Sequence, residues 1–178
     1  QNEMSIPISF PLFIKPLTGG DSRGVDANSI VYDFLSFQAK VLDIKRKHNL
    51  RSLAETYLSG KEYSVSILQD HSNGNLIAMP IEIVVKKNIN GHRILDYDIK
   101  DNDHEKVIEV SDRKIFNQLS DLAKNAFTAL GGKSLGRIDI KMDHCSVPHF
   151  IEANLMPGLR KGYFYRSCLL NLNMSYEQ

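Results

Sequence analysis

The segments Gly136-Arg137-Ile138-Asp139-Ile140 and Phe150-Ile151-Glu152-Ala153-Asn154 both alternate polar and apolar residues, and a turn-like Asp143-His144-Cys145-Ser146 lies between them. Successive side chains of a β-strand point to opposite faces of the sheet, so the alternation predicts the two arms of a hairpin. The polar residues of each arm then share one face, and the isoleucines and the alanine share the other. If the polar faces coincide, two carboxylates, an amide and a guanidinium converge.

The polar face of this hairpin has two interpretations. Antiparallel hairpins commonly leave one face in water, where an arginine opposite a glutamate is a solvated ion pair of small energetic consequence. Alternatively, the carboxylate and amide oxygens bind a hard cation and the guanidinium binds an anion. The turn Pro157-Gly158 follows directly and favours the second interpretation, because its backbone N–H groups can point back toward a ligand.

Composition excludes several classes of protein. The chain has 178 residues, of which 42% are hydrophobic and 24% charged, enough for one core or two small lobes. A formal net charge of +1 indicates neither a nucleic-acid nor a membrane partner, and no apolar run approaches membrane-spanning length or resembles a signal peptide. We therefore expect a cytoplasmic protein. Cys145 and Cys168 have neither metal-ligand nor disulfide spacing and are expected to be reduced and structural.

The remaining pattern predicts mixed helices and strands. Outside the hairpin, strands are expected in residues 6–14, 52–58, 63–68 and 76–85. Helices are expected from the cap candidate Asp26 through Leu42, from the cap Ser111 to Gly131-Gly132, and from about Tyr163 onward. Residues 96–109 are expected to be a polar connection.

Two further stretches have a possible ligand role. Lys15 ends an apolar strand just before the glycine-rich residues 18–24, whose N–H groups can close over phosphate oxygens. This loop fits neither the dinucleotide nor the P-loop spacing, and the alternative is a surface loop beside a solvated lysine. Residues 55–62 have a carboxylate at each end. The backbone between them can bind a planar base and Glu62 can accept from ribose hydroxyls, or the stretch is a hairpin with charged ends.

Taken together, these stretches resemble a known family. The matching segments are Ile14-Lys15-Pro16, the glycine-rich loop, residues 55–63, Asp96-Tyr97-Asp98-Ile99-Lys100, Gly136-Arg137-Ile138-Asp139 and Glu152-Ala153-Asn154-Leu155-Met156-Pro157-Gly158. Their order and approximate spacing resemble the ATP-grasp superfamily, and most closely the D-alanine-D-alanine ligase family. The resemblance implies an α+β ATP-grasp fold, with antiparallel sheets, flanking helices and a nucleotide between two lobes. Residues 1–60 would belong to the central ATP-binding lobe and 61–178 to the C-terminal metal-binding and catalytic lobe.

The resemblance also implies a role for each matching position. It assigns the ATP contacts to Lys15, Gly19, Gly20, Ser22, Glu55, Tyr57, Leu58 and Glu62. It assigns magnesium, or manganese, to Asp139, Glu152 and Asn154, and it assigns catalysis to Lys100, Arg137 and Gly158. Where the D-alanine ligases have a Ser-His-Ser-like stretch, this chain has the substrate candidates Arg160, Lys161, Gly162 and Tyr163. The second substrate is therefore expected to differ.

The activity implied by the resemblance is ATP-dependent joining of a carboxylate to an amine through an acyl phosphate. The substrates would be small molecules, amino acids above all, and the full-length protein would form a homodimer. The family's N-terminal domain is absent from these 178 residues, so this part alone is expected to be inactive. The alternative is an ATP-grasp domain that binds a nucleotide or a partner without catalysis.

Overall fold

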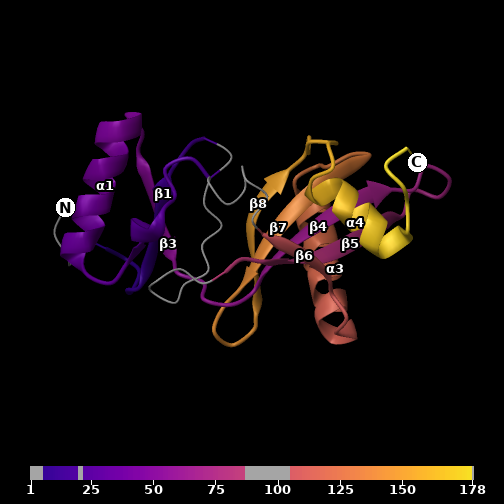
Figure 1. The fold of residues 1–178 in the computed structure, drawn as a ribbon, viewed down its shortest axis with the longest axis horizontal. Coiled ribbons are helices and arrows are strands. Elements are labelled where there is room, and N and C mark those ends of the chain that lie inside the picture. Colours follow the sequence, from indigo (N-terminus) through magenta and orange to yellow (C-terminus); the bar gives the residue numbers. More distant parts are fainter. Residues whose placement is uncertain (1–5, 20–21, 87–104, 178) are drawn as a thin grey trace. The chain divides into compact units, whose positions relative to one another are not determined.

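The computed structural model describes residues 6–19, 22–86 and 105–177 (Figure 1). The chain divides into two compact units, one of Gln1–Ser59 with Val85–Glu105 and one of Gly60–Val84 with Lys106–Gln178. Within the described ranges, no helix is both long and apolar enough to cross a membrane.

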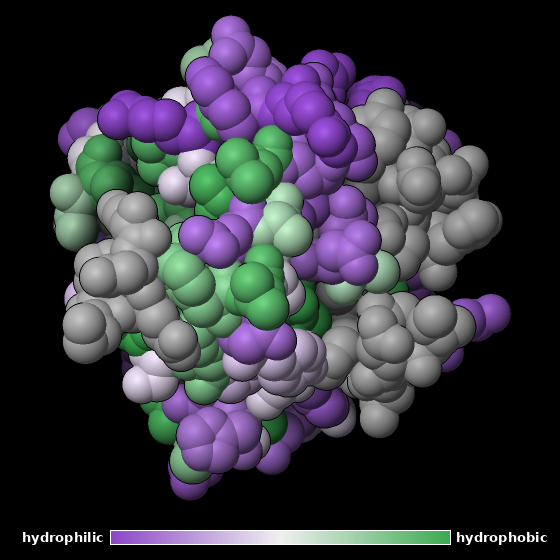
Figure 2. Space-filling model, turned by 90° about the vertical axis from the view of Figure 1, so that its left-hand side faces the viewer, coloured by the Kyte–Doolittle hydropathy of each residue, from purple (hydrophilic) through white to green (hydrophobic). Residues whose placement is uncertain are grey.

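In the first unit, an antiparallel sheet packs against one helix. The sheet has the order β2-β1-β3, with β1 at Leu12–Pro16, β2 at Ile30–Val31 and β3 at Ser52–Thr56, and the helix α1 is Phe34–His48. The buried core between them consists of Leu12, Ile14, Val31 and Ile44. On the outer side, α1 leaves Leu35 and Leu42 exposed. In Figure 2, hydrophobic residues (green) form patches on the visible face, with hydrophilic residues (purple) around them.

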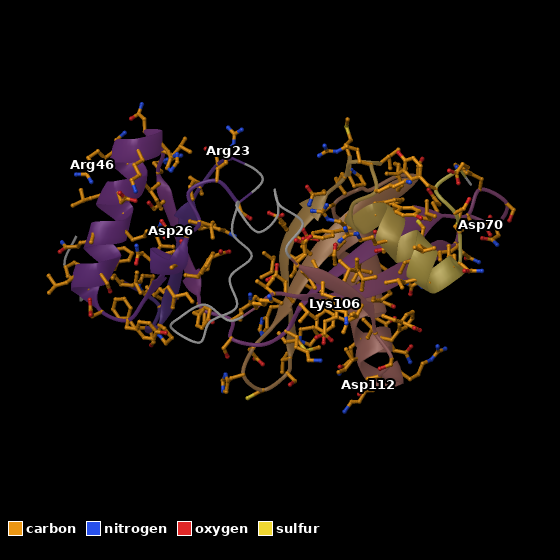
Figure 3. The ribbon with its side chains drawn as sticks, viewed as in Figure 1. Arg23, Asp26, Arg46, Asp70, Lys106 and Asp112 are labelled. Carbon is orange, nitrogen blue, oxygen red and sulfur yellow. The ribbon has the colours of Figure 1, made fainter. Side chains whose placement is uncertain are left out.

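The expected helix from Asp26 is wrong at its start. Asp26 caps only the short 3-10 helix η2, Ala27–Ser29, and α1 begins seven residues later behind its own cap, Asp33. Ile30 and Val31 lie between the caps and pair with β1 instead. Their β-branched side chains suit a strand, and pairing buries both. Asp26, labelled in Figure 3, also accepts from the buried Lys40 of α1, with Nζ and Oδ1 2.8 Å apart.

The strand expected over residues 6–14 is also shorter than predicted. Only its last part forms a strand, because β1 begins at Leu12. Pro7 and Pro11 interrupt the earlier residues, and proline has no N–H to donate to a ladder. The apolar side chains of this part still pack against the core of the unit.

The second unit contains an antiparallel sheet of order β6-β5-β4-β7-β8 with a helix on each face. Its strands are β4 Glu62–Gln69, β5 Leu76–Val84, β6 Lys106–Glu109, β7 Leu135–Met142 and β8 Pro148–Asn154. Its helices are α3 Arg113–Ala129 and α4 Tyr163–Leu172. The core beneath α3 brings Leu119, Ala123 and Phe127 against apolar residues of β4 and β7. On the other face, Phe164 and Cys168 of α4 pack on Met79.

Most expected elements of this unit are confirmed, with two corrections. The polar connection expected over residues 96–109 contains β6 within its described part, where Val107 and Ile108 pair with β5. The cap of α3 is Asp112, labelled in Figure 3, rather than Ser111. The Asp112 carboxylate accepts from the second and third backbone N–H groups of the helix. A carboxylate is the stronger acceptor at the positive end of a helix dipole.

The predicted hairpin is β7 and β8. Arg137 pairs with Asn154 and Asp139 with Glu152, so the polar faces coincide as expected. The register then shifts, and Ile151 becomes an extra residue with no opposite partner. Such a bulge bends the strand and increases its twist next to the polar residues.

Gly60 makes a close backbone contact that predicts a stability effect. A Cβ there would lie 2.6 Å from the carbonyl oxygen of Met142 and 2.7 Å from that of Asp143. Backbone atoms cannot rotate away, so Gly60→Ala should lower the free energy of unfolding by about 1–3 kcal/mol in urea denaturation. The control is Gly158→Ala, because a Cβ at Gly158 meets no atom within 4 Å. Equal stability of the two variants would contradict the crowded geometry.

Candidate functional site

A first row of polar residues crosses the middle of the second unit's sheet. Ser64 of β4 is in register with Asp139 of β7, which is in register with Glu152 of β8. Opposite residues on neighbouring strands point to the same face, with Cβ atoms about 5 Å apart. The other face of the sheet holds the apolar core beneath α3. Two carboxylates and a hydroxyl therefore lie side by side on the face that also carries α4.

A second row lies next to it. Ser66, Arg137 and Asn154 are in register across the same three strands. Ser66 is fully buried, and neither its Oγ nor the buried Nδ2 of Asn154 has a hydrogen-bond partner among the described residues. Buried polar atoms are nearly always satisfied in folded proteins, by water or ligand where the chain itself does not do so. The second row therefore places two buried polar atoms without a partner among the described residues beside the Arg137 guanidinium.

The two rows are joined by a bidentate ion pair. Arg137 donates from Nε to Oδ1 of Asp139 and from Nη2 to Oδ2, each at 2.9 Å. Burial by itself would lower the pKa of Arg137, but the charge and hydrogen bonds of Asp139, with the charge of Glu152, outweigh it and raise that pKa. The guanidinium is thus permanently charged. Ser64 Oγ also donates to Asp139 Oδ1, at 2.8 Å.

The start of α4 borders this site. The ring of Tyr163 lies over the Arg137 guanidinium, with 5.6 Å between the ring centre and Cζ. The N-cap of α4 is Gly162, which supplies no side-chain cap. Lys161 instead lies over the ring of Tyr176, with Nζ 5.3 Å from its centre. Among the predicted substrate residues, Tyr163 therefore contacts Arg137 of the polar rows, whereas Lys161 contacts the ring of Tyr176.

Arg160 and Gly158 lie in the exposed segment before α4. A Cβ built on Gly158 meets no atom within 4 Å, so space is open beside its backbone.

A third row extends the polar track on the same face. Glu62 is in register with Lys141, and its carboxylate accepts from Lys141 Nζ at 2.9 Å. The alternative of a charged hairpin over residues 55–62 is wrong, because β3 pairs with β1 whereas β4 pairs with β5 and β7. Glu62 therefore belongs to the same sheet as Asp139.

The predicted residues of the first unit form a separate group. Lys15 Nζ lies 2.7 Å from Glu55 Oε2, so two expected ATP contacts pair with each other. Tyr57 and Leu58 follow β3 and are half-buried. Gly19 and Ser22 have positive φ angles of 123° and 57°, as expected for a glycine-rich loop. Gly20 and Lys100 lie outside the described residues.

Both cysteines are free, as expected, with Cys145 exposed and Cys168 buried. Ligand atoms of Asp143, His144 and Cys145 lie within 4.8 Å of one another at the β7–β8 turn. The Asp143 carboxylate there is already in contact with the ring of His149, at 3.2 Å. This turn is not part of the three polar rows.

Sequence reasoning missed that Ser64, Ser66 and Lys141 lie on this polar face of the sheet. The period of two is the signal that predicts them, because Ser64 and Ser66 follow Glu62 at steps of two residues and Lys141 follows Asp139 in the same way. The strands had been predicted, but the pairing of β4 with β7 had not.

Comparison with known proteins identifies the family. All of residues 1–178 match the family model described as D-ala D-ala ligase C-terminus. The chain belongs to the D-alanine-D-alanine ligase family. The resemblance based on the motifs is thereby confirmed.

Relatives from this family match the chain over nearly all of its length. The chain is 25% identical over 174 residues to a D-alanine--D-alanine ligase of Corynebacterium glutamicum, a match that covers 96% of the chain and 47% of that protein. It is 27% identical to the corresponding enzyme of Laribacter hongkongensis, over 96% of the chain and 52% of that protein. The chain thus spans about half the length of these ligases.

Solved structures of the family show the same fold. The VanG D-Ala:D-Ser ligase from Enterococcus faecalis matches with a TM-score of 0.74 and 22% identity, over 97% of the chain and 48% of that structure. A D-alanine--D-alanine ligase from Bacillus anthracis complexed with ATP matches with a TM-score of 0.67 and 22% identity, over 94% and 48%. The predicted ATP-grasp fold, with antiparallel sheets and flanking helices, is confirmed.

Proposed function

We propose that the protein is an ATP-dependent ligase that joins a carboxylate to an amine, as do the D-alanine-D-alanine ligases of its family. The observation that carries the proposal is the pair of polar rows on β4, β7 and β8. They place the charges of Arg137, Asp139 and Glu152 beside Asn154, whose buried Nδ2 has no hydrogen-bond partner among the described residues. A solvated salt bridge would not need a buried amide next to it.

The donor set fits a hard divalent cation. Asp139, Glu152 and Asn154 supply carboxylate and amide oxygens on neighbouring strands, and oxygen is what magnesium and manganese require. We propose that these three residues hold the cation. When bound, it would neutralise charge on the phosphates of ATP.

We propose that residues of the first unit bind the nucleotide. Lys15 would contact the phosphates and Glu55, Tyr57 and Leu58 the adenine, with the glycine-rich loop over the phosphates. Lys15 already binds an anion in its ion pair with Glu55, and it would exchange that carboxylate for a phosphate when ATP binds. In the second unit, Glu62 would accept from the ribose hydroxyls while Lys141 fixes its carboxylate.

The reaction needs no protein nucleophile. The carboxylate oxygen of the first substrate attacks the γ-phosphate and releases ADP, and the amine of the second substrate then displaces phosphate from the acyl phosphate. Arg137, charged at every relevant pH, and the N–H of Gly158 would stabilise the oxyanion that forms in the second step. Arg160 would bind the carboxylate of the second amino acid, a role for which its exposed position leaves it available.

The test is phosphate release by the full-length protein. With ATP, magnesium and pairs of D-amino acids, we expect phosphate release that depends on both amino acids and a ligated product visible by mass spectrometry. Magnesium-dependent ATP binding without product for any amino acid or small carboxylate would favour a non-catalytic nucleotide-binding role instead.

A further inference from the structure

We propose that Ser64 is a positioning residue that determines which oxygen of Asp139 is left for the divalent cation. This role depends on the proposed function, because it concerns the same cation. Ser64 is fully buried on β4, and its hydroxyl is one of three donors to the Asp139 carboxylate.

The three hydrogen bonds are divided unequally between the two oxygens. Oδ1 accepts from Ser64 Oγ at 2.8 Å and from Arg137 Nε at 2.9 Å, whereas Oδ2 accepts only from Arg137 Nη2, at 2.9 Å. A carboxylate oxygen has two lone pairs in the plane of the group. Both lone pairs of Oδ1 are therefore engaged, and Oδ2 keeps one for a ligand.

Arg137 alone cannot produce this difference. A guanidinium fork donates one hydrogen bond to each oxygen of a carboxylate, so with Arg137 alone both oxygens of Asp139 would keep one free lone pair. The hydroxyl of Ser64 removes this equivalence because it bonds to one oxygen only. Its position is fixed, since Ser64 and Asp139 are in register within the sheet and burial excludes competing water.

Ser66 provides a matched control. It lies two residues farther along the same strand, on the same face, and is equally buried. Its hydroxyl, however, has no hydrogen-bond partner among the residues that the structure describes. Replacing either serine with alanine removes one buried hydroxyl from the same face of the sheet. Only Ser64→Ala also removes a hydrogen bond to Asp139.

The experiment measures the magnesium concentration that half-saturates ATP binding, by calorimetric titration of the full-length protein. Partners that orient a metal ligand are typically worth about 10–100-fold in metal affinity. We expect Ser64→Ala to raise this concentration by about 10-fold or more and Ser66→Ala to leave it unchanged. Equal values for Ser64→Ala and the wild type would overturn the proposal.

A second pair of variants separates the hydroxyl from packing. Ser64→Thr keeps the hydroxyl and Ser64→Val replaces it with a methyl group of similar size, so both add the same bulk at a buried position. We expect Thr to retain the wild-type magnesium requirement and Val to show the requirement of Ala. If Thr and Val behave alike, Ser64 acts only through packing and the proposal fails. If the wild-type protein binds ATP equally well with and without magnesium, the proposed function is overturned, and the role of Ser64 with it.

Discussion

Arg137→Met should lower kcat by about 10²–10³-fold, the usual cost of removing one donor from an oxyanion site. Arg137 also forms an ion pair with Asp139, whose largely buried carboxylate would lose its charged partner in this variant. We therefore expect the free energy of unfolding to fall by about 2–3 kcal/mol. Phosphate release gives the first quantity and urea unfolding the second.

Arg137→Lys is the informative control for this variant. Lysine keeps the positive charge but cannot reproduce the two parallel hydrogen bonds of the fork. We expect it to recover part of the lost stability and little of the lost kcat. Because the pKa of Arg137 is raised above its already high usual value, no step in the wild-type pH profile between pH 6 and 9 should arise from it. A near-normal kcat for Arg137→Met would exclude this residue from the chemistry.

Asp139→Asn should have two large effects at once. It removes a charge from the proposed cation site, so we expect the magnesium concentration that half-saturates ATP binding to rise at least 10-fold. It also places an amide group against the Arg137 fork and leaves that guanidinium without its anion, at a cost of about 3 kcal/mol. Calorimetry and urea unfolding of the same preparation measure both.

Glu152→Gln separates the two effects. Glu152 is exposed and forms no ion pair or side-chain hydrogen bond with other described residues, although its charge acts on Arg137. We therefore expect ATP binding to need a higher magnesium concentration for half-saturation. The free energy of unfolding should change by less than about 0.5 kcal/mol. If Glu152→Gln binds magnesium and ATP as the wild type does, Glu152 is not a ligand of the cation.

The hairpin was predictable because its signal is local. Alternation with a period of two places Arg137 and Asp139 on one face whatever the rest of the chain does. The start of α1 was not predictable in the same way, because the chain offers two equivalent caps, Asp26 and Asp33, each with a serine three residues later. The pairing of Ile30 and Val31 with β1 decides between them, and that contact is not local.

The residues of the site also divide into those that a local pattern predicts and those that depend on strand pairing. Asp139, Glu152 and Asn154 were found from their own strands, but Ser64 is 75 residues away from Asp139 in the sequence. Only the pairing of β4 with β7 brings its hydroxyl to the carboxylate. Likewise, the ion pair of Lys15 and Glu55 depends on the register of β1 and β3, which no local pattern specifies.

Thermal unfolding with ATP, in magnesium or in EDTA, tests the metal-dependent nucleotide site most directly. A ligand at 100 times its dissociation constant adds about 2.7 kcal/mol, which for a chain of this length raises Tm by ~5–10 °C. We predict this rise with magnesium and ATP, a much smaller one with ATP in EDTA, and the loss of the difference in Asp139→Asn. A melting temperature that ATP leaves unchanged, or raises equally with and without magnesium, would contradict the proposed site.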